Sequence, residues 1–196
     1  MTRAQQAAWR AEPLIWGQGA RVFEAFVEPT CPYSARAFPK LFDLLAAAGE
    51  DRLTLKVRLL SQPWHMFSGV ICRAILAAST GEGGREAARR VMAAVYADRE
   101  AFEFTRHAFG PNMDATPNDI LSRIEARSGE AVAAAFANPE LDREVRWHTR
   151  YARQNGAHVT PTFMIDGTIR SELSSGDPVE KWLEALALDD PASVQR

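Results

Sequence analysis

The chain has 196 residues, 46% of them apolar, and its 23 basic side chains nearly balance 25 acidic ones. This length and composition indicate one enlarged globular domain and exclude a collagen, a disulfide-rich scaffold or a largely disordered chain. The formal net charge of −2 gives no general reason to expect a nucleic acid or an anionic membrane as partner.

The N-terminal stretch carries Arg3, Arg10 and Glu12 and has no apolar segment of the kind found in secretory signals. No apolar run in the chain approaches the roughly 20 residues that a membrane-spanning helix needs. We therefore expect a cytoplasmic protein.

Two predicted strands flank a predicted helix in the first third of the chain. Residues 21–27 are rich in β-branched and aromatic residues on both faces, which is typical of a central strand covered on both sides. A helix is expected over 32–48, where Gly49 would end it, and a second strand over 53–60, where apolar and polar residues alternate. A short additional strand is expected around 14–16.

The middle of the chain, residues 66–156, is predicted to be helical throughout. Helices are expected over 66–79, 86–97 and 99–106, and two more after Thr116 and Asn138, which are capping residues that each precede a proline. No convincing strand occurs in this stretch.

The last part of the chain returns to strand character. Asp166 and Gly167 separate two short apolar runs, 162–165 and 168–170, and this is a strong hairpin pattern. A final helix is expected over 178–188.

The chain has two cysteines, Cys31 and Cys72, too few to hold a cytoplasmic chain together by disulfides. Cys72 lies in the apolar run 70–76, so we interpret it as a core residue. Cys31 lies where a buried strand meets a helix that has Pro32 in its first turn. Free backbone N–H groups and the positive end of the helix dipole would favour a thiolate there, and the hydroxyl of Ser34 could donate to it. The alternative is that Cys31 is an ordinary N-cap residue.

Two segments carry a resemblance to a known family. Residues 26–34, Phe-Val-Glu-Pro-Thr-Cys-Pro-Tyr-Ser, resemble the active-site entry of the DsbA-like branch of the thioredoxin fold, where an acidic residue precedes Cys-Pro-x-Cys. Residues 159–167, Val-Thr-Pro-Thr-Phe-Met-Ile-Asp-Gly, are similar to that family's second signature. The resemblance implies an α/β thioredoxin-like fold with a central mixed sheet, formed by residues 1–65 and 157–196 around a helical insertion at 66–156.

The resemblance also implies a substrate site next to Cys31. Pro161 would be cis and would expose the backbone of Thr160, so that an extended substrate could pair with it as an added strand. Pro32 and Tyr33 would line the same site.

Two further polar residues are candidate auxiliary groups. Glu24 lies in the middle of a predicted strand, where its carboxylate would either relay protons near the thiol or pair with an arginine. His65 would either overhang the site or lie at the surface. The histidines and cysteines show no metal-binding spacing, and no glycine-rich nucleotide loop appears, so we expect no metal and no tightly bound cofactor.

The sequence departs from the family at Ser34, where the family has its second active-site cysteine. A resolving thiolate releases the mixed disulfide from within the loop, and a serine cannot do this. Cys31 would therefore depend on glutathione as a co-substrate, on a thiol of the substrate, or on Cys72.

Three functions remain open at this point. The favoured one is a thiol–disulfide oxidoreductase that forms mixed disulfides with protein or small-molecule partners through Cys31 alone. The second is a thioredoxin-fold binding module without catalysis. The third is a glutathione transferase or isomerase of the kappa-class type, whose motif resembles Ser-Pro-Tyr-Ser.

Overall fold

The computed structural model describes residues 12–104, 106 and 109–188, which are built around a five-stranded sheet with the order β1-β3-β2-β4-β5. The strands are β1 (Ile15–Gly17), β2 (Arg21–Val27), β3 (Leu53–Leu59), β4 (Thr162–Ile165) and β5 (Thr168–Ile169). β2 runs parallel to β3, whereas the other neighbouring pairs are antiparallel. The predicted central mixed sheet is thereby confirmed.

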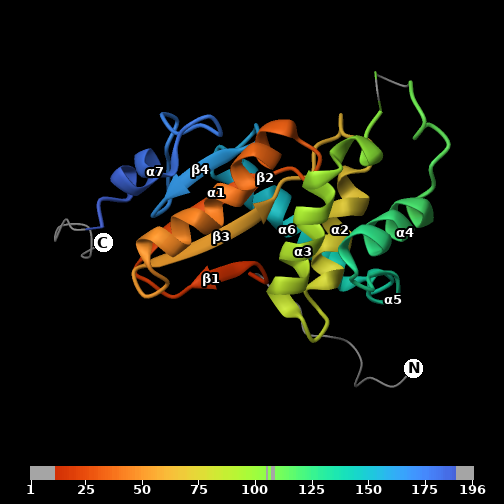
Figure 1. Cartoon of the computed structure of the whole chain (residues 1–196), viewed down its shortest axis with the longest axis horizontal. Coiled ribbons are helices and arrows are strands. Elements are labelled where there is room, and N and C mark those ends of the chain that lie inside the picture. The colour runs from red at the N-terminus through yellow and green to blue at the C-terminus, as the bar shows by residue number, and fades with distance from the viewer. Residues whose placement is uncertain (1–11, 105, 107–108, 189–196) are drawn as a thin grey trace.

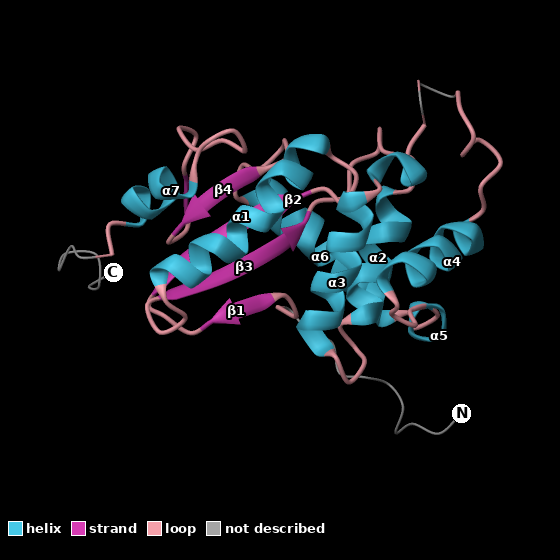
Figure 2. Ribbon diagram, viewed as in Figure 1, coloured by secondary structure: helices cyan, strands magenta, loops and turns pink. Residues whose placement is uncertain are grey.

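The helices lie on both faces of the sheet and in a separate block at one end of it (Figures 1 and 2). They are α1 (Pro32–Ala48), α2 (Ser68–Ala78), α3 (Gly84–Ala97), the 3-10 helix η2 (Arg99–Phe102), α4 (Pro117–Ser128), α5 (Ala133–Phe136), α6 (Glu140–Gln154) and α7 (Val179–Leu186). The chain forms α2 to α6 between β3 and β4, in the stretch where the sequence predicts an insertion. None of the described helices is long and apolar enough to cross a membrane.

The helix α1 has the bounds that its sequence pattern predicts. Ala37, Leu41 and Leu44 of its apolar stripe are fully buried. Gly49 ends the helix with a φ of 91°, a conformation that favours glycine. The helix begins at Pro32, directly after Cys31, and this places the cysteine at its N-terminus.

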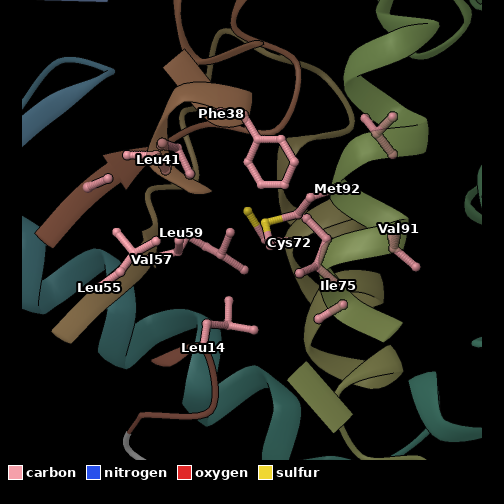
Figure 3. Close-up of a cluster of buried hydrophobic side chains, with 14 of the residues drawn as sticks. Leu14, Phe38, Leu41, Leu55, Val57, Leu59, Cys72, Ile75, Val91 and Met92 are labelled. Carbon is pink, nitrogen blue, oxygen red and sulfur yellow. The ribbon is translucent and has the colours of Figure 1, made fainter. Parts of the chain in front are cut away.

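Side chains of β2 alternate between two cores. Phe23 and Ala25 belong to the larger one, which also takes in residues of α1, α2 and α3. Figure 3 shows part of it, with side chains of β3 facing those of the helices. Phe26 lies on the opposite face, in a smaller cluster with Met164 and Ala152 of α6. The sheet is thus covered on both faces, as the apolar character of 21–27 indicates.

The predicted helix over 99–106 is wrong. Of the residues described in this stretch, 99–104 and 106, only Arg99–Phe102 is helical, and as a 3-10 helix. The side-chain amide of Asn112 donates to the backbone carbonyls of Glu100 (3.3 Å) and Glu103 (2.6 Å), so a side chain satisfies acceptors that a continuing helix would use. A buried Phe102 anchors the turn.

A buried ion pair joins β2 to β3 on the face that α6 covers. Nε of Arg58 donates to Oε2 of Glu24 over 2.6 Å, and the hydroxyl of Tyr151 donates to Oε1 over 3.0 Å. The guanidinium also contacts Glu12 at 2.6 Å and lies 5.1 Å from the ring centre of Trp147. Arg58 is 1% exposed, so these partners must compensate its buried positive charge.

We expect the variant Glu24→Ala to lower the free energy of unfolding by about 3 kcal/mol, because it leaves a buried guanidinium without its main partner. Glu12→Ala is the matched control, since it removes a more exposed carboxylate from the same arginine and should cost less than about 1 kcal/mol. Urea denaturation of both variants measures the difference. Equal losses of unfolding free energy in the two variants would show that the buried carboxylate stabilises the fold no more than the exposed one.

Candidate functional site

Cys31 is the N-cap residue of α1, as the sequence predicts. Its backbone is extended (φ −67°, ψ 125°), Pro32 begins the helix, and the Cys31 carbonyl accepts the N–H of Ala35 over 2.9 Å. The sulfur makes no capping hydrogen bond to the helix. Cys31 is 5% exposed, so a small part of the residue reaches the surface at the positive end of the helix dipole.

The segment before β4 provides the other wall of the site. The Thr160–Pro161 peptide bond is cis, and Cys31 Sγ donates to the Thr160 carbonyl oxygen over 3.4 Å. The sheet explains this proximity, because Phe26 of β2 pairs with Thr162 of β4. The end of one strand therefore lies next to the start of the other, and the two signature segments meet.

Ser34 occupies the third position of α1 and is fully buried. Its Oγ accepts the backbone N–H of Glu28 over 3.2 Å, so the side chain ties the first turn of α1 to the loop that precedes Cys31. The hydrogen bond that the sequence suggests, from Ser34 to the sulfur of Cys31, stays a prediction.

Cys72 lies on α2 within the large core, where Figure 3 shows it among apolar side chains. Both Cys31 and Cys72 are free thiols. Burial, together with the charge of Glu28, raises the pKa of the Cys72 thiol well above its ordinary value. Cys72 is therefore a protonated core residue at neutral pH, and it is poorly suited to attack a mixed disulfide.

Glu28 is a buried carboxylate that the sequence analysis quoted only as part of a motif. Its Oε2 accepts the N–H of Thr30 over 2.8 Å and the Thr30 hydroxyl over 2.9 Å. The same hydroxyl lies 2.9 Å from Nδ1 of His65. His65 therefore contacts the loop next to Cys31. The sequence signal for Glu28 was its place as the acidic residue that precedes Cys-Pro in the motif.

Glu24, the other candidate auxiliary group, lies in the ion pair with Arg58 and Tyr151. This geometry favours the arginine-paired alternative over a proton relay to the thiol. Glu28 lies three residues before Cys31 in the chain and is the better-placed carboxylate.

Four exposed apolar side chains lie on the segments that lead to the thiol, and we call Tyr33, Trp64, Met66 and Val159 the apolar rim. Each is more than half exposed, at 56%, 68%, 62% and 68% respectively. Tyr33 lies on the helix that Cys31 begins, Val159 precedes the cis-proline segment, and the other two flank His65. Exposed apolar residues gathered on neighbouring segments are typical of a surface that binds another molecule.

Two hollows lie near these elements. One, of about 280 Å³, is lined by Trp64, His65, Met66, Glu103, Phe104 and Arg106. A larger one, of about 700 Å³, lies between α6 and residues 61–63 and has three arginines in its wall. In the parts of the chain that the structure describes, no group of acidic, histidine or cysteine side chains is arranged to hold a metal ion.

Known proteins share this architecture. The sequence profile of the thioredoxin family matches residues 17–185. A candidate protein-disulfide isomerase from Pseudomonas syringae has 64% sequence identity and a TM-score of 0.87, and the match covers 89% of this chain and 98% of that one. No curated protein matches the sequence.

More distant structures share the fold alone. DsbA2 from Pseudomonas aeruginosa has 18% identity and a TM-score of 0.62, over 93% of this chain and 98% of that one. A periplasmic thioredoxin-like protein from Salmonella enterica serovar Typhimurium has 15% identity and a TM-score of 0.66, over 97% and 99% of the two chains.

The family profile spans most of the chain, and the Pseudomonas syringae protein is similar over almost its whole length. The predicted thioredoxin-like fold with helices between β3 and β4 is thereby confirmed, and DsbA2 shares it. The chain belongs to the thioredoxin family.

Proposed function

We propose that the protein is a thiol–disulfide oxidoreductase that works through one nucleophile, Cys31. The observation that carries this proposal is the position of its sulfur, at the N-terminus of α1 and 3.4 Å from the carbonyl of Thr160, with a serine where a second thiol would lie. The relative from Pseudomonas syringae, a candidate protein-disulfide isomerase, supports the general activity.

The chemistry begins with attack on a disulfide. The thiolate of Cys31 attacks one sulfur of a disulfide R–S–S–R′, so that a Cys31–S–S–R bond forms and R′ leaves as a thiolate. A second, external thiolate then attacks the mixed disulfide and restores the Cys31 thiolate. The enzyme is neither oxidised nor reduced overall, so the net reaction exchanges one disulfide for another.

An extended polypeptide fits the surroundings of the sulfur as substrate. The backbone of Thr160 can pair with such a segment as an added strand, and the apolar rim can contact its side chains. Pro32 and Tyr33 would lie on the opposite side of the same segment. Protein disulfides and thiols are therefore the favoured partners, with no sign of a nucleic acid or membrane partner in the sequence.

The resolving thiol is proposed to come from outside the chain. Cys72 is fully buried in the core and protonated, which disfavours it as the attacking group. Glutathione is the simplest external candidate because it is small enough to reach a sulfur that is nearly enclosed. A cytoplasmic location would supply reduced glutathione and remains a proposal, with subcellular fractionation as its test.

Treatment of the protein with oxidised glutathione should add one glutathionyl group per chain, on Cys31. We expect Cys31→Ser to abolish the adduct and Cys72→Ser to retain it, because Cys72 is buried and protonated. Mass spectrometry of the intact protein and of its peptides measures both results. Absence of any adduct on Cys31 would favour the binding module, and saturable glutathione binding that survives Cys31→Ser would favour the transferase.

The variant Ser34→Cys should convert the protein to dithiol chemistry. The introduced thiol would lie on the first turn of α1, and we expect it to form a disulfide with Cys31 and to displace a bound mixed disulfide at least about tenfold faster than the parent protein. Ser34→Ala is the matched control, because it removes the hydroxyl without adding sulfur. Thiol counting after oxidation and the rate of glutathione release measure the effect; a variant that stays fully reduced would contradict the proposed geometry.

A further inference from the structure

Glu28 combines complete burial with incomplete hydrogen bonding. The residue is 0% exposed, and only Oε2 of its carboxylate has partners, namely the N–H and hydroxyl of Thr30. Oε1 has no partner within hydrogen-bonding distance among the residues that the structure describes, although the nearby Ser68 side chain acts to lower the pKa of the carboxyl group. A buried carboxylate oxygen without a partner is costly for a fold, and such groups are frequently functional.

His65 connects this carboxylate to solvent. Its Nδ1 lies 2.9 Å from the Thr30 hydroxyl and 3.6 Å from Oε2 of Glu28. The His65 side chain is 18% exposed, whereas that of Glu28 is fully enclosed. The three side chains thus form a continuous path from a buried acid to a half-buried base.

A proton can move along this path without any change in net charge. An imidazolium gives its Nδ1 proton to the Thr30 hydroxyl while that hydroxyl gives its own proton to Oε2 of Glu28. The result is a neutral imidazole and a neutral carboxyl group in place of an ion pair. When the shared proton is lost to solvent, one negative charge remains in the buried pocket.

The other groups around Glu28 do not neutralise that negative charge. The Tyr96 hydroxyl of α3 donates to the backbone carbonyl of Glu28 over 3.2 Å, and the charge of Glu28 also acts on Cys72 of α2. Burial raises the pKa of each well above its ordinary value, so both stay neutral. Arg99 of η2 donates to the carbonyl of Thr30 over 3.3 Å and is paired with Glu103. Cys31 belongs to the same loop, and its backbone N–H donates to the carbonyl of Glu28 over 3.2 Å.

We propose that Glu28, Thr30 and His65 act as one proton-linked unit that sets the charge beside Cys31 and thereby the pH at which its sulfur becomes a nucleophile. The inference rests on the proposed function of Cys31 and makes Glu28 and His65 positioning residues. A thiolate forms readily while the unit holds its proton, and it is opposed by a like charge once that proton is lost.

The direction of the Glu28 pKa agrees with this arrangement. Burial raises it above the ordinary value of 4.5, and the interaction with His65 acts in the opposite direction. The folded protein therefore holds this proton to a higher pH than the unfolded chain, and Glu28 lowers stability as the pH rises through that window. Glu28→Gln should consequently gain stability over the parent protein between acid and neutral pH, which also checks that the variant folds.

The decisive experiment is the pH profile of Cys31 alkylation by iodoacetamide on the full chain, with the modified peptide identified by mass spectrometry. Glu28→Gln removes the negative charge, and we expect its midpoint to fall by about one pH unit, which is about tenfold faster alkylation on the acid side. His65→Gln removes the compensating base, so its midpoint should rise. In the double variant the effect of His65→Gln should disappear, because there is no longer a carboxylate for it to balance.

Glu24→Gln is the matched control, because Glu24 is a second buried glutamate near β2 whose partner is Arg58, and it should leave the midpoint unchanged. Opposite shifts of the two single variants, with loss of the His65 effect in the double variant, support the unit. Any other pattern overturns it, including shifts in the same direction, which a general loosening of the site would produce. Alkylation needs no turnover, so failure of Cys31 to form mixed disulfides would reject the proposed function and leave this test intact.

Discussion

The contact between Cys31 Sγ and the carbonyl of Thr160 joins segments 129 residues apart, and the site exists only because the sheet brings them together. β2 pairs with β3 on one side and with β4 on the other. The end of β2, the end of β3 and the start of β4 therefore lie at the same end of the sheet. This pairing allows the chain to form α2 to α6 between β3 and β4 without moving the thiol from the cis-proline segment.

Two buried glutamates near β2 show different ways of enclosing a negative charge. Glu24 has a permanent partner, because the guanidinium of Arg58 does not lose its proton at any relevant pH. Glu28 has a hydroxyl and, beyond it, an imidazole, a group that exists both with and without a positive charge. A pair with a fixed cation stabilises a fold, whereas a pair whose cation titrates couples its surroundings to pH. The second arrangement lies next to the only thiol of the described chain that reaches the surface.

Features set by local pattern could be predicted from the sequence. The bounds of α1 follow from Pro32, an apolar stripe and Gly49, and the hairpin from Asp166 and Gly167. The helix expected over 99–106 failed because the side chain of Asn112, from a later loop, takes its carbonyls. The role of Glu28 was missed for a similar reason, since it depends on His65, which a different element supplies. Contacts between distant segments leave no periodic signal in the sequence.

Ser34 affects both the chemistry available to Cys31 and the structure of the loop that precedes it. Its oxygen cannot resolve a mixed disulfide, so in the proposed reaction each turnover would depend on a thiol from outside the loop. The same oxygen accepts the N–H of Glu28 and so fixes the loop that carries the carboxylate and Thr30. Sulfur accepts hydrogen bonds only weakly, so a cysteine at this position would hold that loop less firmly. The residue that excludes dithiol chemistry in the proposed function is thus also the one that orders the loop of Glu28 and Thr30, and under that proposal the reactivity of Cys31 would depend on this order.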